Sequence, residues 1–427
     1  MSTAIFWFRQ DLRLHDNPAL MRAVANSTAL LPVYCYPNDT PSVWLDQRVG
    51  EHRQAFLSQA SAGLKALLRT KGSDLLFLNG NAATSLIEIA SQYQINQIFC
   101  EEIAAPEEQA EIMALRQAGL TVTTVWQSSL LQPDELPFSI AQLPAVFTRF
   151  RHDIERATCQ PPPPLPSPPR LPPLPADIPS VLTKSNAEIA ARVEPRSAFP
   201  HYLAAFNGSE QAGLAHVSRY FAGELAQRYK LTRNGLMGTD YSTKFSPWLA
   251  TGALSARQIY ADLRHHERQF GANESTYWIW FELLWRDYFR FLHLQYGAAL
   301  YRARGLATSS PSSKHSSKRF QRWCEGNTGE PLVDAGMREL AASGYLSNRM
   351  RQIVASYLVH DLGCDYRAGA AWFEQQLLDY DPYSNQGNWL YGAGLGTDPR
   401  GGRRFNLDKQ TREHDADGLY RSHWSSP

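Results

Sequence analysis

The first 125 residues alternate short apolar runs with longer helical patterns, and this alternation limits the possible folds more than any other feature. The apolar runs, rich in β-branched and aromatic residues, lie at 4–8, 30–36, 74–78, 97–100 and 121–125. Helical patterns lie between them at 49–69, 82–93 and 106–117, and the pair Asn17-Pro18 is typical of a helix start. This alternation predicts a doubly wound parallel sheet, and therefore an α/β domain over residues 1–130.

The residues after the first predicted strand argue against the usual dinucleotide-binding domain. That position holds FRQDLRLHD and lacks the GxGxxG loop that lets the backbone approach a pyrophosphate. We therefore expect no NAD in this half of the chain. A sheet of this kind still has a crevice where its strand order reverses, and another ligand could bind there.

A proline-rich segment separates this half from the rest of the chain. Residues 160–179 contain 11 of the 27 prolines, which predicts an extended connector within residues 131–195. A PxxP match also fits an SH3 ligand, although a strap between two domains is the favoured interpretation. From residue 196 onward we find only helical patterns broken by Gly, Asn and Ser, so residues 196–427 are predicted to form an all-α domain.

Composition excludes several functional classes. With 43% hydrophobic residues and a net charge of +1, the chain can form sizeable cores but is no polycation, so any DNA binding needs a local basic patch. The five cysteines form no CxxC pair, and we expect neither a metal site nor a disulfide framework. No targeting segment or apolar run of about 18 residues is found, so we expect a soluble, cytoplasmic protein, by default a monomer.

Two helical patterns in Tyr345–Tyr391 carry closely spaced polar residues. Ser347 and Asp365 are predicted N-caps of the two helices. The first helix should present Asn348, Arg351 and Gln352 on one face and Ile353, Val354, Tyr357 and Leu358 on its core side. The second should bury Ala371, Trp372, Leu377 and Leu378.

A turn with Asp379, Asp381 and Asn385 follows the second helix. Together with Arg351, these donors and acceptors could surround a heterocycle. They could equally form a buried salt-bridge network, such as an Arg351–Asp379 pair.

Two further segments could bind a ligand. In YSTKFSPWLA, hydroxyls and a cation precede a helix that Pro247 should begin, which fits either a phosphate cradle or a simple Ser N-cap. In YWIWFELLWRDYFRF, one helix side should carry Glu282, Arg286, Arg290 and His293, with Trp278 and Trp285 on nearby turns. Carboxylate, guanidinium and indole together suit a flat ligand that forms hydrogen bonds.

Basic residues gather in two other places. The GxGxG in residues 392–406 follows no predicted strand and opens no helix, so we reject a nucleotide loop there. Arg400, Arg403 and Arg404 could instead contact a DNA backbone. The cluster Lys314, Lys318, Arg319 and Arg322 could do the same or be a solvated surface.

The chain resembles the photolyase/cryptochrome family from FWFRQDLRLHDNPAL to HDADGLYRSHW, and within it the DASH cryptochromes. The motifs that carry the resemblance are PDELPFSIAQLPAVFTRFR, KLTRNG, YSTKFSPWLATGALS, ELLWRDYFRF, SNRMRQIV and LDYDPYSNQGNWLYGAG. It implies an α/β domain followed by a helical domain that binds FAD.

The resemblance also assigns cofactor contacts. For the phosphates and ribityl chain it implies Tyr229, Ser242, Thr243, Lys244, Phe245 and Ser246. Around the flavin ring it implies Glu282, Arg286, Asn348, Arg351, Asp379, Asp381 and Asn385. A folate, 5,10-methenyltetrahydrofolate, is the implied antenna, with Glu102 as the first candidate contact and Glu101 as the second, unless both belong to a solvated acidic loop.

The implied reaction is light-driven electron transfer from reduced FAD to a cyclobutane pyrimidine dimer in DNA. Its catalytic residues would be Glu282, Trp285, Asn385 and Trp389, and its further substrate contacts Gln352, Tyr391, Arg400 and Arg403. Gln352 and Tyr391 replace a Met and a Trp of duplex-active photolyases, which implies a preference for single-stranded DNA. The alternatives are a blue-light sensor that signals through a partner, and a dark flavoprotein or nucleic-acid-binding regulator.

The chain departs from the family at the electron relay. Trp389 fits the position next to the flavin, but Tyr366 and Ser313 stand where two further tryptophans are expected. Tyrosine is a poorer electron donor than tryptophan, and serine is none. We therefore expect slow photoreduction, or a detour through Trp323 or Trp372.

Overall fold

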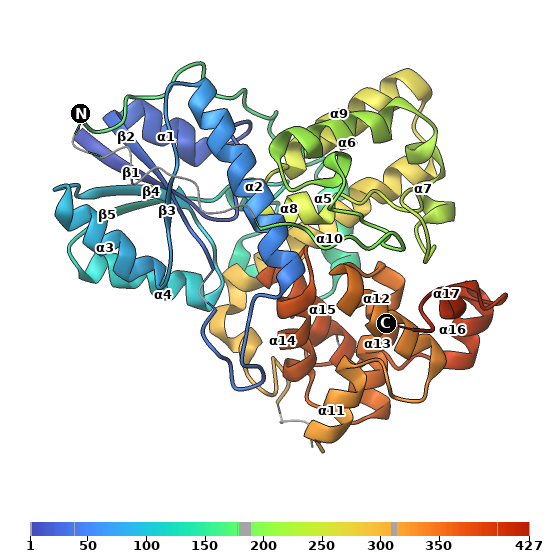
Figure 1. The fold of residues 1–427 in the computed structure, drawn as a ribbon. Coiled ribbons are helices and arrows are strands. Elements are labelled where there is room, and N and C mark those ends of the chain that lie inside the picture. Colours follow the sequence, from blue (N-terminus) through green and yellow to red (C-terminus); the bar gives the residue numbers. More distant parts are fainter. Residues whose placement is uncertain are drawn as a thin grey trace.

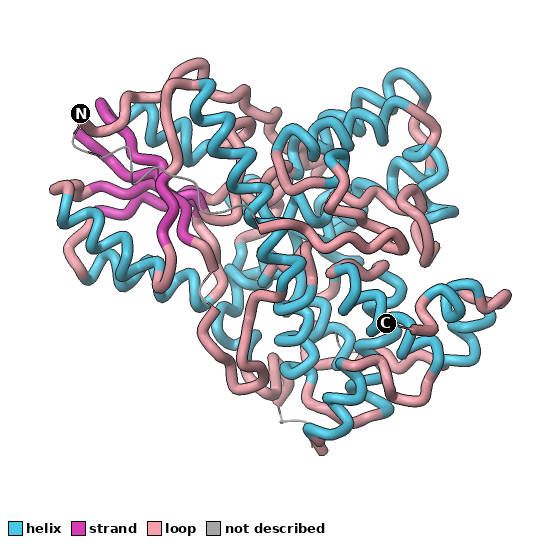
Figure 2. The backbone as a smooth tube through the Cα atoms, in the orientation of Figure 1, coloured by secondary structure: helices cyan, strands magenta, loops and turns pink. Residues whose placement is uncertain are grey.

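The computed structural model describes residues 2–37, 39–176, 178, 189–308, 314–398 and 400–426, which form two domains (Figure 1). The described residues before about position 130 contain the whole sheet, and helices make up most of the regular structure after it (Figure 2). Ser313, the expected outer residue of the electron relay, lies outside the described residues. No helix of the described part is long and apolar enough to cross a membrane.

The N-terminal domain is the predicted doubly wound sheet. Its five strands are β1 (Ser2–Phe8), β2 (Ser27–Cys35), β3 (Leu76–Leu78), β4 (Gln97–Glu101) and β5 (Thr121–Val125). All pairs are parallel, in the order β3-β2-β1-β4-β5, so the strand order reverses between β1 and β4. The strands between which it reverses are buried along most of their length, because helices cover both faces of a parallel sheet.

Four helices complete this domain: α1 (Pro18–Asn26), α2 (Glu51–Thr70), α3 (Ala82–Gln92) and α4 (Pro106–Gln117). Their positions agree with the predicted helical patterns to within two residues. Asn17 caps α1 as predicted, because its side chain accepts a hydrogen bond from the N–H of Leu20 at 3.0 Å.

The segment between the domains contains two 3₁₀ turns, η1 (Pro133–Glu135) and η2 (Ile140–Gln142), and the helix α5 (Phe147–Arg156). The proline-rich residues that follow lie along the α/β domain. The N–H of Leu30 donates to the carbonyl of Pro173 at 3.0 Å, and Leu171 and Leu174 pack against the two cores of the sheet.

The second domain is helical. It contains η4 (Ala204–Phe206), α6 (Glu210–Ala222), α7 (Leu225–Thr232), α8 (Ser246–Thr251), α9 (Ala256–Phe270), α10 (Glu274–Tyr296), η5 (Gly297–Tyr301), α11 (Ser317–Cys324), α12 (Pro331–Ser343) and α13 (Asn348–Ser356). A π-helical turn, η6 (Tyr357–Asp361), continues α13, and α14 (Tyr366–Gln376), α15 (Pro382–Ala393), α16 (Leu407–His414) and α17 (Leu419–His423) follow.

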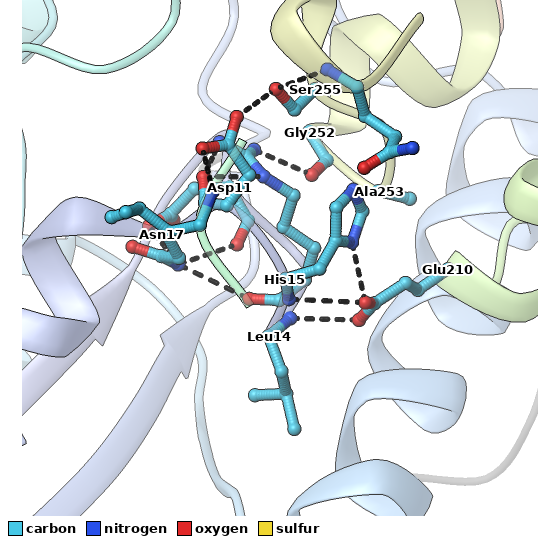
Figure 3. Close-up of polar contacts among 12 residues, drawn as sticks. Asp11, Leu14, His15, Asn17, Glu210, Gly252, Ala253 and Ser255 are labelled. Atoms are coloured by element: carbon cyan, nitrogen blue, oxygen red, sulfur yellow. Dashed lines mark hydrogen bonds and ion pairs between the residues drawn. The ribbon is translucent and has the colours of Figure 1, made fainter. Parts of the chain in front are cut away.

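The loop after β1 joins the two domains, which gives the FRQDLRLHD segment a structural role (Figure 3). The N–H groups of Leu14 and His15 donate to the Glu210 carboxylate of α6 at 2.8 and 3.2 Å. The Arg13 guanidinium donates to the carbonyl of Gly252 at 2.8 Å. Asp16 forms a buried ion pair with Arg257 of α9 at 2.7 Å.

Gly252 is required where this loop meets the helical domain. Its φ is +73°, and a Cβ built on it would lie 1.8 Å from the carbonyl oxygen of Gln10. Both conditions favour glycine, because other residues rarely adopt this conformation and a side chain would separate the two backbones. Within the same loop, Asp11 accepts hydrogen bonds from Asn17 and Gln127 at 3.1 and 2.9 Å.

The buried side of α14 differs from the prediction. Ala371 and Trp372 are only half-buried, and the helix buries Ala368, Gly369, Ala370 and Phe373 instead. The reason is close packing: a Cβ on Gly369 would lie 2.2 Å from the Trp389 ring, so small residues face the neighbouring helix α15. Leu377 and Leu378 are buried as predicted, but they lie beyond the end of α14.

Candidate functional site

Helix α13 presents its predicted polar residues beside Asp379. Ser347 caps the helix by accepting from the N–H of Met350 at 3.2 Å, and Ile353, Val354 and Leu358 are fully buried. Tyr357, the first residue of the π-helical turn, is only half-buried, contrary to the prediction. Asp365 caps α14 as predicted.

Arg351 and Asp379 form the expected ion pair at 2.9 Å. Arg351 also donates to the carbonyl of Leu346 at 2.8 Å, which fixes its guanidinium. The second oxygen of Asp379 is buried and has no hydrogen-bond partner among the described residues. A buried carboxylate oxygen without a donor is costly, so this atom is suited to a ligand that brings an N–H group.

Asp381 has more partners than the sequence indicated. It caps α15 by accepting from the N–H groups of Tyr383 and Ser384 at 2.9 and 3.3 Å. Its other oxygen is paired with Arg290 at 2.7 Å, and both side chains are buried. Burial alone would raise the pKa of Asp381, but the charges of Arg290 and Arg286 outweigh it and lower the pKa. A ring N–H would therefore meet an ionised carboxylate that is already held in place.

Asn385 is oriented by its own amide group. The amide nitrogen donates to the carbonyl of Ala370 in α14 at 3.0 Å, which leaves the amide oxygen for other contacts. Asn348 is exposed at the start of α13. Gln352 is half-buried, and its amide oxygen accepts from Arg349 at 3.1 Å.

The YSTKFS segment is organised around Lys244. Lys244 is 2% exposed and has a φ of +56°. Its ammonium lies 3.3 Å from the Tyr241 ring centroid and 4.7 Å from that of Tyr345, and it has no hydrogen-bond partner within the described part of the chain. Burial lowers the pKa of Lys244 well below its usual value, so an anion near this nitrogen would restore its charge.

The other residues of this segment differ in exposure, and Tyr241 and Phe245 are buried. Ser242 and Thr243 are half-buried and Ser246 is exposed. The predicted alternative, a Ser N-cap, is wrong, because α8 begins at Ser246 and Phe245 occupies the cap position with no side-chain hydrogen bond. Tyr229 is buried on α7, which packs against α10.

Helix α10 directs its polar residues in two ways. Glu282 is ion-paired with Arg233 of the loop after α7, and that guanidinium lies 4.4 Å from the ring centroid of Trp278. Arg286, by contrast, donates to the backbone carbonyls of Ser128 and Leu249.

The remaining residues of this side of α10 are structural. Arg290 is held by Asp381, and His293 is buried and bonded to the carbonyl of Phe289 at 2.7 Å. Burial lowers the pKa of His293 to about 4, so it is neutral at physiological pH.

An aromatic group surrounds Trp285 on the same helix. Phe147 is stacked on it with ring centroids 3.8 Å apart and an interplanar angle of 13°. Tyr391 lies 5.6 Å away at 61°. These three rings line an apolar cavity of about 40 Å³ that Asp398 and Arg400 also border.

The arginine loop, which contains Arg400, Arg403 and Arg404, lies beside this cavity. Arg403 is placed 4.5 Å from the ring centroid of Tyr391, while Arg400 is paired with Asp398 at 2.6 Å. Arg404 is paired with Asp361 of the π-helical turn at 2.5 Å. The second basic cluster, Lys314, Lys318, Arg319 and Arg322, is exposed.

The predicted relay residues are buried together. Trp389 is 3% exposed, and its ring centroid lies 6.4 Å from that of Trp323, which is fully buried. Tyr366 is buried as well, and its hydroxyl donates to the carbonyl of Arg302 at 2.8 Å.

The two antenna candidates differ in accessibility. Glu101 is fully buried, and both its carboxylate oxygens lack a partner among the described residues. Burial raises its pKa to about 8. Glu102 is half-buried at the carboxyl end of β4, so it is the better placed of the two for a bound ligand.

The contacts of Arg233 and Phe147 were not predicted from the sequence. Arg233 stands in the KLTRNG motif and Phe147 in PAVFTRFR, but neither was assigned a role. A signal existed for Arg233, because a carboxylate on an aromatic-rich helix needs a cation nearby. No signal existed for Phe147, since the stack joins residues 138 positions apart.

Comparisons with known proteins assign this architecture to a class. Residues 4–169 match the family model described as DNA photolyase, and residues 278–426 match the FAD binding domain of DNA photolyase. The crystal structure of a bacterial class III photolyase from Agrobacterium tumefaciens has a TM-score of 0.81 at 28% identity and covers 99% of this chain and 86% of its own. The fold and its two domains are thus those of photolyase-type flavoproteins.

Two further relatives narrow the class. A Cryptochrome DASH of Gloeobacter violaceus is 42% identical over 99% of this chain and 85% of its own length. The crystal structure of a Synechocystis cryptochrome has a TM-score of 0.90 at 41% identity, covering 99% of this chain and 88% of that one. The chain belongs to the DASH cryptochromes of the photolyase/cryptochrome family and is an FAD flavoprotein.

Proposed function

We propose that this protein repairs cyclobutane pyrimidine dimers in DNA under blue light, with a preference for single strands. The observation that carries the proposal is the arrangement on α10, where Glu282 and Trp285 lie one helical turn apart and Trp285 lies beside Tyr391. Indole and phenol rings provide a stacking surface for bases turned out of the strand, and the carboxylate can hydrogen-bond a base edge. Bound FAD in its reduced form would supply the electron that splits the dimer.

The buried polar atoms fit the flavin. A ring N–H would satisfy the unpartnered oxygen of Asp379, which Arg351 holds in place. A phosphate would supply the anion that the buried ammonium of Lys244 lacks. Asn385 would offer its amide oxygen near the ring, since Ala370 fixes the amide nitrogen.

The remaining cofactor contacts follow from the same motifs. For the phosphates and ribityl chain we propose Tyr229, Ser242, Thr243, Phe245 and Ser246 as further contacts. Asp381 and Asn348 would lie at the flavin, whereas Arg286 would act by holding the loop of Ser128 against α10.

The preference for single strands rests on Gln352 and Tyr391. An amide and a phenol stack less strongly on a flipped base than larger or more polarisable side chains. Turning a base out of a single strand needs little unpairing energy, so weaker stacking on that base is sufficient there. Arg403, close to Tyr391, would contact the phosphate backbone.

A folate antenna is the second cofactor that we propose. Glu102 is its proposed contact, because Glu101 is enclosed in the protein. Absorbance spectroscopy of the protein reconstituted with 5,10-methenyltetrahydrofolate tests this: Glu102→Gln should weaken retention of the folate, and Glu101→Gln should not.

Illumination of the reduced protein with dimer-containing oligonucleotides tests the repair function. We expect repair of single strands to exceed repair of duplexes, and Trp285→Leu to abolish it while FAD absorbance is kept. Trp280→Leu, on the same helix but outside the ring stack around Trp285, is the matched control. If neither substrate is repaired, the protein is not a photolyase, and a blue-light sensor becomes the better proposal.

A further inference from the structure

The segment that joins the two domains supplies a residue to the base-stacking site. Phe147 is the first residue of α5, within the PAVFTRFR motif, and it is 5% exposed. Its stack on Trp285, at 3.8 Å and 13°, has the shortest centroid separation among the ring pairs of the described residues. The two rings are therefore nearly parallel and in direct face contact.

Polar contacts hold α5 and the residues before it against α10. The hydroxyl of Tyr288 donates to the carbonyl of Pro144 at 3.0 Å. Near the start of α10, the Tyr277 hydroxyl accepts a hydrogen bond from Arg151 and donates one to Glu155, both at 2.7 Å. The position of Phe147 is therefore fixed by hydrogen bonds before and after it in the sequence.

Three other aromatic rings surround Trp285 at larger separations than Phe147. Phe147 covers one face of the indole, and Tyr288 lies at its edge, 5.9 Å away at 79°. Phe289 and Tyr391 lie at 5.5 and 5.6 Å, both tilted relative to the indole. Trp285 nevertheless remains half-buried, so part of its surface is accessible.

We propose that Phe147 is a positioning residue that fixes the plane of Trp285 and restricts base stacking to the opposite face of the indole. This inference rests on the proposed function and specifies its substrate. With Phe147 on one face of the indole, an undamaged base can stack on Trp285 only from the other side and cannot be enclosed between the two rings, whereas the dimer, whose two bases turn out together, needs only that one stacking face. Phe147 thus favours the dimer over an undamaged base turned into the same site.

Fluorine NMR of the protein labelled with 5-fluorotryptophan tests the stack directly, without substrate. Trp285→Phe identifies the resonance of Trp285. Phe147→Leu should shift that resonance, because the leucine removes the ring current of the stacked phenyl group, and Phe147→Tyr should leave it near its original position. A Trp285 resonance that does not move in Phe147→Leu would overturn the proposal.

Fluorescence anisotropy with single-stranded oligonucleotides tests the consequence. We expect Phe147→Leu to lower the ratio of affinities for dimer-containing over undamaged strands by roughly three- to tenfold, with Phe147→Tyr restoring it. Phe138→Leu is the matched control, since Phe138 lies in the same segment and contacts Phe150 at 5.9 Å instead of Trp285. FAD absorbance should be equal in all four proteins, which excludes general unfolding.

The two proposals fail in different ways. A wild-type protein that binds both strands equally contradicts the proposed repair function, whatever the NMR result. A wild-type preference for the dimer that Phe147→Leu leaves unchanged contradicts only the role of Phe147.

Discussion

Trp323 is the residue that we propose as a substitute donor in the expected electron relay. Tyr366 is enclosed and bonded to a carbonyl, whereas Trp323 lies 6.4 Å from Trp389 between ring centroids. Phe373 stands against both indoles, at 6.2 and 5.1 Å. The structure thus favours Trp323 over Trp372 as the proposed detour.

We expect Trp323→Phe to slow light-driven reduction of bound FAD severalfold, because the phenyl group keeps the packing but is a poor electron donor. Trp372→Phe should have a smaller effect. Absorbance changes of the flavin under blue light, with an external thiol as reductant, measure the rate. Photoreduction that stays fast in both variants would remove the detour.

Glu101 is the residue with the clearest pH dependence. Its pKa of about 8 lies above the usual value of 4.5 because burial disfavours the charge. The folded protein therefore holds this proton more tightly than the unfolded chain does. The stabilising contribution is complete below about pH 4.5 and is lost as the pH rises through about 8.

Glu101→Gln should remove this loss, since glutamine does not ionise. We expect the variant to gain on the order of 2–4 kcal/mol relative to wild type between about pH 5 and pH 9. Urea unfolding at both pH values measures the difference, with Glu102→Gln as the half-exposed neighbouring control. An equal pH dependence of wild type and Glu101→Gln would contradict the argument.

At the scale of elements, the loop after β1 is one of the structural links between the domains. Its contacts are almost all made by backbone groups or buried ion pairs, so they depend on close approach. Gly252 sets that approach, because a Cβ there would lie 1.8 Å from the carbonyl oxygen of Gln10.

Gly252→Ala should therefore destabilise the protein by about 3 kcal/mol or more, through both the left-handed backbone and the displaced loop. Gly418→Ala is the matched control: its φ of +72° and ψ of +11° are close to those of Gly252, but the added Cβ would meet only the end of the flexible Arg421 side chain, at 3.3 Å. It should cost only about 1 kcal/mol. Chemical denaturation followed by circular dichroism compares the two, and equal losses would show that the interface tolerates the methyl group.

Local patterns in the sequence predicted the elements well and their long-range contacts poorly. The alternation of strand and helix patterns predicted the sheet and its helices, and the N-cap preferences of short polar residues predicted the roles of Asn17, Ser347 and Asp365. The prediction of the buried side of α14 was wrong, because glycine and alanine, rather than large apolar residues, face Trp389. Periodicity counts large side chains and so misses a face that is buried by close backbone packing.

In the candidate site, too, local features were predictable and long-range contacts were not. The Arg351–Asp379 pair was predictable because opposite charges at helix ends are often paired. The Arg290–Asp381 pair and the Phe147–Trp285 stack were not, since each depends on how distant segments pack. The sequence indicated candidate residues, and the fold determines which of their side chains are already held by other parts of the chain.

At the scale of the whole molecule, a net charge of +1 means that the proposed DNA binding would depend on a local basic surface. Within the arginine loop, Arg400 and Arg404 are paired with Asp398 and Asp361. Arg403 lies instead over the ring of Tyr391, next to the cavity that Trp285 lines. Arg403 is therefore the arginine best placed to meet a phosphate beside the stacked bases.

Arg403→Ala should weaken binding of single-stranded DNA and make it less dependent on salt. One lost phosphate contact on a single strand lowers the slope of log affinity against log salt by about 0.7, because one fewer counterion is released. Lys318→Ala, an exposed cation of the second basic cluster, is the control and should leave the slope unchanged. Fluorescence anisotropy titrations at several salt concentrations measure both slopes. An unchanged slope in Arg403→Ala with a reduced slope in Lys318→Ala would place the DNA backbone on the other basic cluster.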